Sequence, residues 1–276
     1  MVAILSNSLL LLTVPTGIKA EPSSSHHFIF TTTIGQPGLL SAAIDTPLIK
    51  TKRDSSATAV KIAEAPAIPI NAQAAAFINN YLKKNRTALS KLKVKSPSYF
   101  KIMDSVFCTY DLPLELKYLA VIESELKTTA TSYVGAKGLW QLMPSTARLL
   151  GLKITKGRDE RTHSYKSTVA AAKYLQGLYN EFGDWLLVIA AYNAGPGTIH
   201  RAIKRSGSTN FWKLQYQLPA QTRMHVKRFV GTHYYFEGQG GITTLTKAEA
   251  IKHLKALTAF EEEQNSNAAP LLANQP

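Results

Sequence analysis

The feature that most constrains the fold is an apolar helical stripe that ends in a carboxylic acid. Four residues of the segment 113–126 recur at the i, i+3, i+4, i+7 spacing of one helical face: Leu116, Leu119, Ala120 and Glu123. Burial disfavours the charged form of a glutamate, so the pKa of Glu123 is predicted to rise. An acid of this kind can donate a proton near neutral pH, as general acid catalysis requires. Glu125 falls about 200° further around the helix and is predicted to face solvent.

Further helices are predicted through the centre of the chain, delimited by proline at first turns, polar N-caps and glycine after last turns. The expected helices cover residues 97–110, 113–126, 144–150, 164–182, 185–194, 196–205 and 219–236, with shorter ones at 74–84 and 247–260. The expected N-caps are Asp111, Ser164 or Ser167, and Asp184. Few alternating β-branched runs separate these segments, so the fold is predicted to be mainly α.

The two ends of the chain differ in composition from its centre. Residues 1–20 contain a short apolar run and are predicted to be a secretory signal peptide, although the usual positive charge before the run is missing. The alternatives are a disordered apolar N-terminus or a misassigned start. Residues 21–72 are rich in Ser, Thr, Pro and Ala and are predicted to be a linker or disordered. The main domain is expected at 73–240, followed by a tail at 241–276 that includes a short helix.

The chain is basic, with a net charge of +14 over 276 residues. Residues 95–240 hold 19 Lys and Arg against 10 Asp and Glu, so nine of the excess charges belong to the predicted domain. This balance favours an anionic partner such as nucleic acid, an acidic membrane surface or a cell-wall polymer, or it only keeps the surface solvated. Basic residues do not alternate with aromatic ones, so nucleic acid is not the expected partner.

Motifs for other chemistry are absent from the sequence. There is no phosphate-binding loop, no dinucleotide-binding turn and no Cys/His metal spacing, so neither a cofactor nor a metal is expected. The single cysteine, Cys108, lies in an apolar pattern and is expected to be a small buried residue rather than a nucleophile.

Three motifs follow one another in order and spacing between residues 97 and 236. They are Glu123-Ser124, residues 138–144 with the sequence GLWQLMP, and residues 190–197 with the sequence AAYNAGPG. Together they resemble the family 1 lytic transglycosylases of glycoside hydrolase family 23, in particular the membrane-bound D type. The resemblance implies a lysozyme-like helical domain with a cleft, and an exported bacterial enzyme of the periplasm or cell envelope. It also implies non-hydrolytic cleavage of peptidoglycan glycan strands that leaves a 1,6-anhydro-N-acetylmuramoyl end.

The resemblance assigns the catalytic role to Glu123, which would protonate the glycosidic oxygen and then accept the proton of the muramoyl C6 hydroxyl. A single acid then suffices, because an internal nucleophile competes effectively with water. The predicted substrate-binding residues are Ser124, Gln141, Met143, Tyr192, Asn193 and His225. Most glycosidases use a second carboxylate. Asp159 and Glu160 lie between arginines in a charged loop and are expected to form surface ion pairs instead.

Several predicted site residues also have a structural interpretation. Ser124 is either a hydrogen-bond donor beside the acid or a small residue where helices approach. Gln141 either binds sugar hydroxyl and acetamido groups or stabilises its loop. Asn193 shares an apolar helical face, so its buried amide needs a partner such as a ligand or Glu123. Tyr192 is expected to place its ring in the core and its hydroxyl toward the cleft.

Residues around the second motif are predicted to support the structure. Trp140 is expected in the core rather than as a platform on which sugars stack. Gly135 and Gly138 are expected to meet the conformational demands of turns. Met143 is expected to pack with partial exposure to the cleft, as the resemblance implies.

The last helix departs from the family pattern. Gln221 stands where the family has Glu, His225 where it has a cleft tyrosine close to the catalytic glutamate, and Lys227 where Pro is common. An imidazole at position 225 could replace the hydrogen bond of the tyrosine, but it adds a group that ionises near pH 6.5 when unperturbed. The alternative is a surface histidine with no role.

Three functions therefore remain open at this point. The first is an exported lytic transglycosylase acting on peptidoglycan glycan strands. The second is a hydrolytic muramidase of the goose-type lysozyme kind, which would need Glu160 or Asp159 to position water. The third is a catalytically weak peptidoglycan-binding protein, suggested by Gln221 and His225. Association with the membrane or cell envelope, and the oligomeric state, stay open.

Overall fold

The computed structural model describes residues 65–272, with side chains up to residue 266. The predicted signal peptide at 1–20 and most of the predicted linker at 21–72 lie outside the described residues. Residues 65–71 have no regular structure, and helices dominate from there to residue 272. The prediction of a mainly α fold is confirmed. In the part of the chain that the structure describes, no helix is long and apolar enough to cross a membrane.

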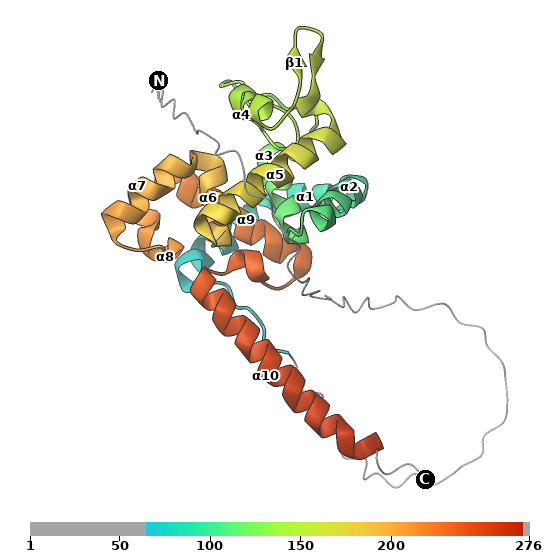
Figure 1. The fold of residues 1–276 in the computed structure, drawn as a ribbon, viewed down its shortest axis with the longest axis vertical. Helices are drawn as coiled ribbons and strands as arrows, with labels where there is room; N and C mark the ends of the chain where they lie inside the picture. Colours follow the sequence, from blue (N-terminus) through green and yellow to red (C-terminus); the bar gives the residue numbers. More distant parts are fainter. Residues whose placement is uncertain (1–64, 273–276) are drawn as a thin grey trace, which may run out of the picture. The chain divides into compact units, whose positions relative to one another are not determined.

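The elements follow one another in the colour order of Figure 1. They are α1 (Ala72–Lys95), α2 (Pro97–Thr109), the 3₁₀ turn η1 (Leu114–Lys117), α3 (Tyr118–Ser124), α4 (Pro144–Leu149), β1 (Ile154–Thr155), β2 (Arg158–Asp159), η2 (Glu160–Thr162), α5 (Ser164–Phe182), α6 (Trp185–Ala194), α7 (Pro196–Ser206), α8 (Phe211–Leu214), η3 (Gln215–Gln217), α9 (Ala220–Glu237), η4 (Ile242–Thr244) and α10 (Lys247–Leu272). The strands β1 and β2 form one short antiparallel hairpin.

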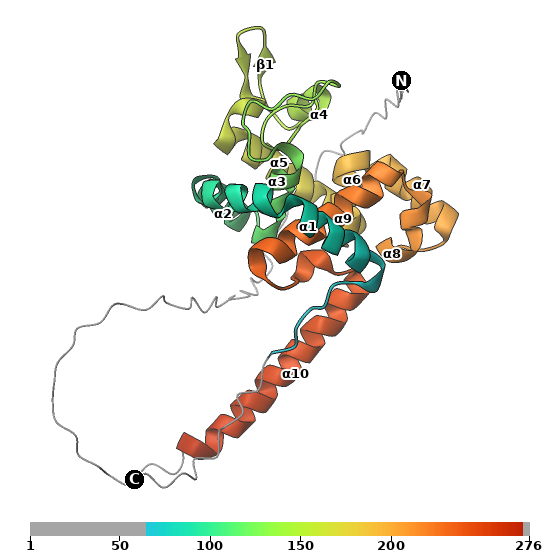
Figure 2. The same ribbon diagram turned by 180° about the vertical axis from the view of Figure 1, so that it is seen from behind.

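Helix α6 is the centre of the core. Its sequence WLLVIAAYNA is apolar on every side, which is typical of a helix surrounded by other elements. It packs against α5, α7 and α9, while α9 also packs against α1 and α3. The predicted N-cap is confirmed, because the side chain of Asp184 accepts from the backbone N–H groups of Leu186 and Leu187. Figures 1 and 2 show α4 and the hairpin at one end of these helices, and α7 and α8 on the side away from α2.

Several predicted boundaries and caps are corrected by the structure. Helix α1 is 24 residues long rather than the predicted 74–84, because its packing on α9 extends it beyond its local signals. Helix α10 continues past residue 260 to Leu272. The segment 113–126 is not one helix but η1 followed by the short helix α3. Asp111 has a φ of +50° and caps nothing, since Pro113 precedes η1 without a side-chain bond.

Two further expectations are wrong. Ser164 and Ser167 lie inside α5, and the N-cap is His163, whose ring nitrogen accepts from the N–H of Lys166 at 3.4 Å. Cys108 is exposed rather than buried, because it lies on the outer face of α2 while Val106 and Phe107 fill the core.

The predicted turn glycines are confirmed, with φ values of +86° at Gly135 and +84° at Gly138.

Candidate active site

Glu123 lies in the last turn of α3, on the face that the apolar stripe predicts. The other members of the stripe, Leu116, Leu119 and Ala120, are fully buried. The Glu123 side chain is 16% exposed, so one edge of the carboxyl reaches the surface. Glu125 turns outward as predicted, with a side chain that is 62% exposed and paired with Lys127 at 2.7 Å.

The end of α3 is conformationally unusual. Glu125 and Leu126 adopt φ values of +53° and +58°, in the left-handed region that non-glycine residues rarely occupy. Backbone strain of this kind collects at functional sites, where the surrounding structure enforces it. Here it stops α3 directly after Glu123-Ser124 and leads the chain away from the helix axis. The acid is thereby left at the end of a helix rather than in its middle.

The surroundings of Glu123 favour its neutral form. Burial raises its pKa from an ordinary value of 4.5 to about 7, while the positive charge of Arg228 acts in the opposite direction. A carboxyl with this pKa is roughly half protonated at pH 7, whereas an exposed glutamate is almost fully ionised. Glu123 can therefore both give a proton and take one back near neutral pH.

His225 faces this acid from α9. It is only 2% exposed, and its Nε2 lies 3.5 Å from Oε1 of Glu123, in contact range but longer than an ordinary hydrogen bond. Burial, helped by the charge of Arg228, lowers the pKa of His225 to about 3. The ring is therefore neutral at physiological pH and does not ionise near pH 6.5 as an unperturbed imidazole would. The alternative of a surface histidine is wrong.

The carboxyl edge of Glu123 opens into a surface pocket, called here the catalytic pocket. Its lining residues are Ile122, Glu123, Ser124, Glu125, Lys127, Ala130, Thr131, Ser132 and Gln141. It thus brings together three of the predicted site residues, Glu123, Ser124 and Gln141. Residues 130–132 contribute to the lining, and its polar groups suit a hydroxyl-rich ligand.

Gln141 combines the two roles that its sequence context allows. Its Nε2 donates to the backbone oxygens of Ala130 at 3.1 Å and Gly138 at 2.9 Å, which uses both amide hydrogens for the loop. Its Oε1 accepts no hydrogen bond from any described residue and remains available in the catalytic pocket. Ser124 is different, since its hydroxyl bonds the backbone oxygens of Ala120 and Leu139 at 3.1 and 2.9 Å. That geometry favours the structural interpretation of Ser124.

The Tyr192 hydroxyl is engaged with the backbone of the second motif. It donates to the backbone oxygen of Trp140 at 2.7 Å, and the Tyr192 ring packs on Tyr174 with centroids 5.5 Å apart. The pKa of Tyr192 is raised by burial and further by the charge of Glu123. Trp140 is fully buried, with its Nε1 donating to Thr168 at 3.0 Å, so its predicted core position is confirmed.

Two predicted residues lie apart from the catalytic pocket. The Oδ1 of Asn193 accepts from the Thr222 hydroxyl at 3.0 Å, so the partner of its amide comes from α9 rather than from Glu123. Met143 precedes α4 and is 39% exposed, in agreement with its expected partial exposure. Gln221 is exposed on the first turn of α9. Neither Asn193 nor Met143 is among the residues that line the pocket.

The other two acidic candidates are engaged in ion pairs, as predicted. Asp159 receives two bonds from Arg161 at 2.9 and 2.8 Å, and Glu160 receives one each from Arg158 and Lys166 at 2.6 Å. These bonds to cationic donors lower the pKa of each carboxyl to about 2. Glu160 and Arg161 are themselves each only 6% exposed, whereas the side chains of Arg158 and Lys166 reach the surface.

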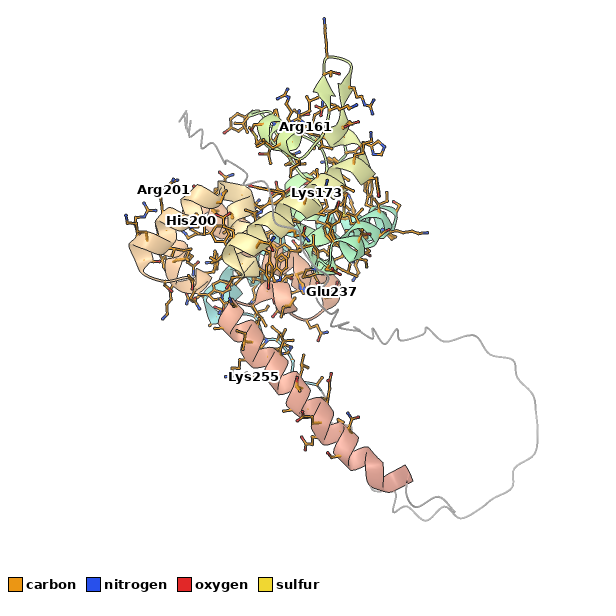
Figure 3. The ribbon with its side chains drawn as sticks, viewed as in Figure 1. Arg161, Lys173, His200, Arg201, Glu237 and Lys255 are labelled. Carbon is orange, nitrogen blue, oxygen red and sulfur yellow. The ribbon has the colours of Figure 1, made fainter. Side chains whose placement is uncertain are left out.

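Arg161, labelled in Figure 3, holds the loop that carries the second motif. Its Nη1 donates to the backbone oxygens of Gly135 at 2.7 Å and Leu142 at 3.0 Å. Gly138 packs against the backbone of Arg161, where a Cβ would lie 2.0 Å from the carbonyl oxygen. Asp159 therefore serves to orient the arginine that shapes the loop of Gln141.

Arg228 is a residue that the sequence analysis missed. It lies three residues after His225, so both project from the same face of α9. Its charge lowers the pKa of both Glu123 and His225. The i, i+3 spacing from His225 was the signal that could have found it.

Among the described residues, no group of three or more acidic, His or Cys side chains is placed to hold a metal ion.

Comparison with known proteins finds a family match in the central part of the chain. Residues 109–215 match the family model described as the transglycosylase SLT domain. The match begins at the end of α2 and includes Glu123, Gln141 and Asn193. It ends before α9, which supplies His225 and Arg228.

Two relatives that the chain resembles carry consistent names. The chain is 37% identical over 168 residues to the membrane-bound lytic murein transglycosylase D of Escherichia coli K12, covering 59% of this chain and 36% of that protein. It is 40% identical over 101 residues to the peptidoglycan transglycosylase gp16 of Escherichia phage T7, covering 36% of this chain and 7% of that protein. The chain thus spans about a third of the first relative and much less of the second.

The fold is shared with a solved structure. A complex of the 70-kDa soluble lytic transglycosylase with bulgecin A superposes with a TM-score of 0.51 at 22% identity, over 64% of this chain and 32% of that chain. This likeness agrees with the predicted lysozyme-like helical fold.

Proposed function

We propose that the chain is an exported lytic transglycosylase that cleaves the β-1,4 bond between N-acetylmuramoyl and N-acetylglucosaminyl units of peptidoglycan. The observation that carries the proposal is one buried glutamate, with a pKa of about 7, at the edge of a polar pocket. The lytic murein and peptidoglycan transglycosylases among its relatives support the same substrate.

The proposed reaction uses Glu123 twice. The protonated carboxyl donates its proton to the glycosidic oxygen, and the bond from that oxygen to the anomeric carbon breaks. The resulting carboxylate accepts the proton of the muramoyl C6 hydroxyl while O6 attacks the anomeric carbon, which closes the 1,6-anhydro ring. Arg228 lowers the pKa of Glu123 and thus stabilises the carboxylate between the two steps. The neutral His225 ring adds no positive charge that would ionise the acid too early.

A hydrolytic muramidase is the less favoured alternative. It would need a second carboxylate that is free to position water, and Asp159 and Glu160 were the candidates. Both accept bonds from cationic side chains, and both belong to the ion pairs around Arg161 and Lys166. A catalytically weak binding protein is disfavoured because the raised pKa of Glu123 serves no purpose in binding alone.

The substrate-binding assignments follow from the pocket. Gln141 is proposed to accept a hydrogen bond from a sugar hydroxyl or acetamido N–H through its free Oε1. Tyr192 and Asn193 are proposed to support the acid and the adjoining cleft from behind, and Ser124 to hold α3 against the loop. The proposed place of action is the cell envelope, with peptidoglycan strands as the partner and no nucleic acid.

Digestion of purified sacculi, followed by mass spectrometry of the soluble products, tests the proposal. Anhydro-muropeptides are expected from the unaltered protein and from Glu181→Gln, a change on α5 outside both pockets, but not from Glu123→Gln. Reducing-end muropeptides would instead identify a muramidase, and retention on sacculi without any product would identify a binding protein. Anhydro products from Glu123→Gln would remove the central assignment.

A further inference from the structure

A second pocket lies beside the catalytic pocket, between α1, α3 and α9. Its lining residues are Tyr81, Asn85, Ala88, Leu89, Leu92, Val121, Ile122, Glu125 and Arg228. Ile122 and Glu125 belong to both pockets, so the two hollows adjoin along the end of α3. Helix α1 packs on α9, and Figure 2 shows both helices beside α3. We call this hollow the α1 pocket. The proposed reaction does not use it.

Arg228 in the α1 pocket has no direct bonding partner among the described residues, although its charge also acts on Glu123. It makes no ion pair and no hydrogen bond with any described residue, and its Nε is fully buried without a partner. A guanidinium has five N–H donors, and a buried donor left unpaired costs free energy. The unused donors therefore suit an anionic ligand. The fork geometry matches a carboxylate in particular, which can accept two parallel bonds.

The other groups in the α1 pocket leave this charge uncompensated. Glu125 is the only acid in the lining, and its exposed carboxylate pairs with Lys127 at 2.7 Å. The Nδ2 of Asn85 donates to the backbone oxygen of Tyr81 at 2.8 Å, and the Tyr81 hydroxyl bonds Thr232 at 3.0 Å. Asn85, Tyr81 and Glu125 thus each have a bonding partner within the protein, whereas the Arg228 guanidinium has none among the described residues.

Two further properties define the ligand. Helix α1, which supplies one wall of the pocket, contains six Lys and Arg residues and no Asp or Glu, so this helix carries a net positive charge. Leu89, Leu92, Val121 and Ile122 give the pocket an apolar wall. A ligand that carries both a carboxylate and short aliphatic groups satisfies this combination, whereas a neutral sugar offers the guanidinium no negative charge.

We propose that the α1 pocket binds a carboxylate of the stem peptide on the glycan strand whose bond lies at Glu123, with Arg228 as its partner. The inference rests on the proposed function, because it needs a glycan strand in the catalytic pocket. Peptides on such a strand carry free carboxylates on short aliphatic residues, which is the chemistry that the pocket selects. The enzyme then recognises a peptide-bearing strand rather than a bare glycan.

The test compares three soluble substrates of equal glycan length. One carries intact stem peptides, one carries peptides with their carboxylates converted to amides, and one is stripped of peptides. The values of kcat/KM are measured near pH 5.5, where Glu123 is protonated and peptide carboxylates are ionised. This pH removes the effect that Arg228 has on the pKa of Glu123. The proteins are the unaltered chain, Arg228→Gln, Asn85→Asp and Lys83→Gln.

The unaltered protein and Lys83→Gln are expected to prefer the intact substrate over both others by about tenfold, the value of a hydrogen-bonded charge. Lys83→Gln is the matched control, because it removes one exposed positive charge from the same helix outside the pocket. Arg228→Gln is expected to lose the preference. Asn85→Asp, which places a carboxylate in the pocket, is also expected to lose it and serves as the test if Arg228→Gln does not fold.

The outcomes separate the two proposals. If the unaltered protein releases no anhydro product from any substrate, the proposed function fails. If it cleaves all three substrates equally well, or if the folded variants slow all three equally, the function stands and the α1 pocket proposal is overturned. Equal preference for intact and amidated peptides over stripped strands also overturns it, since peptide shape rather than charge would then be recognised. Inhibition by inorganic phosphate that is equal for all substrates and is lost in Arg228→Gln would identify a phosphate site instead.

Discussion

Replacing Glu123 with Gln is expected to stabilise the domain at neutral pH while it removes the activity. Burial raises the pKa of Glu123 from 4.5 to about 7, so the folded state binds this proton more tightly than the unfolded chain does. The destabilisation from ionising a buried acid is therefore absent below about pH 4.5, grows as the pH rises, and becomes constant above about pH 7. The difference between the pKa values of the unfolded and the folded state corresponds to about 3 kcal/mol in the free energy of unfolding. Glutamine has no charge at any pH and escapes this cost.

Thermal and urea denaturation of both proteins near pH 4.5, 6 and 8 measures the effect. The stability difference is expected to be near zero at the lowest pH and to reach about 3 kcal/mol at the highest. At roughly 2–4 °C per kcal/mol for a domain of this size, the melting temperature of Glu123→Gln should be higher by roughly 6–12 °C at pH 8.

Glu125→Gln is the matched control, since the Glu125 carboxylate is 62% exposed and lies only two residues away. Its stability difference from the unaltered protein should not follow the same pH course. A stability gain for Glu123→Gln that is equal at pH 4.5 and pH 8 would refute the reasoning, because desolvation of a charge cannot act on a carboxyl that is already neutral. No gain at any pH would also refute it and would mean that Glu123 is solvated.

Three further outcomes are expected. His225→Gln should leave the pH–rate profile unchanged between about pH 5 and 7, because the ring, with its pKa lowered to about 3, is already neutral there. A change of rate with pH in this range that is present in the unaltered protein and absent from the variant would contradict this. Gly138→Ala should cost more than about 3 kcal/mol in urea denaturation, since its Cβ would lie 2.0 Å from the Arg161 carbonyl oxygen. Gly135→Ala, with a similar φ but free space around it, should cost only about 1–2 kcal/mol. Asp184→Ala removes the side-chain bonds to the first turn of α6 and should lower the free energy of unfolding by about 1–2 kcal/mol. Asp184→Asn keeps an accepting oxygen and should lose less, so equal losses in the two variants would show that capping is not the cause.

The local signals in the sequence predicted most of the helices. Asp184 before an apolar run, Gly183 after the preceding helix and Pro196 at a first turn all act within one or two turns of chain, so their effect can be read without the fold. The helix positions around them agree with the prediction to within one or two residues. The direction of Glu123 followed in the same way, from the spacing of its apolar neighbours.

The errors arose where distant segments decide the outcome. Helix α1 runs far beyond its local signals because α9 covers one of its faces. Asn193 finds its partner in Thr222, 29 residues further along the chain. Cys108 is exposed because the neighbouring Phe107 takes the position that faces the core. None of these contacts has a signature in the residues immediately around it.

The apolar stripe ending in Glu123 shows where the two kinds of information divide. The sequence alone determined that an acid shares a face with core residues, because helical periodicity sets the direction of each side chain relative to its own helix. Only the tertiary structure decided what faces that acid: a neutral His225 at 3.5 Å, the charge of Arg228, and two adjoining pockets. The reason is that desolvation and Coulomb effects depend on distances to α1 and α9, and the packing of separate segments sets those distances.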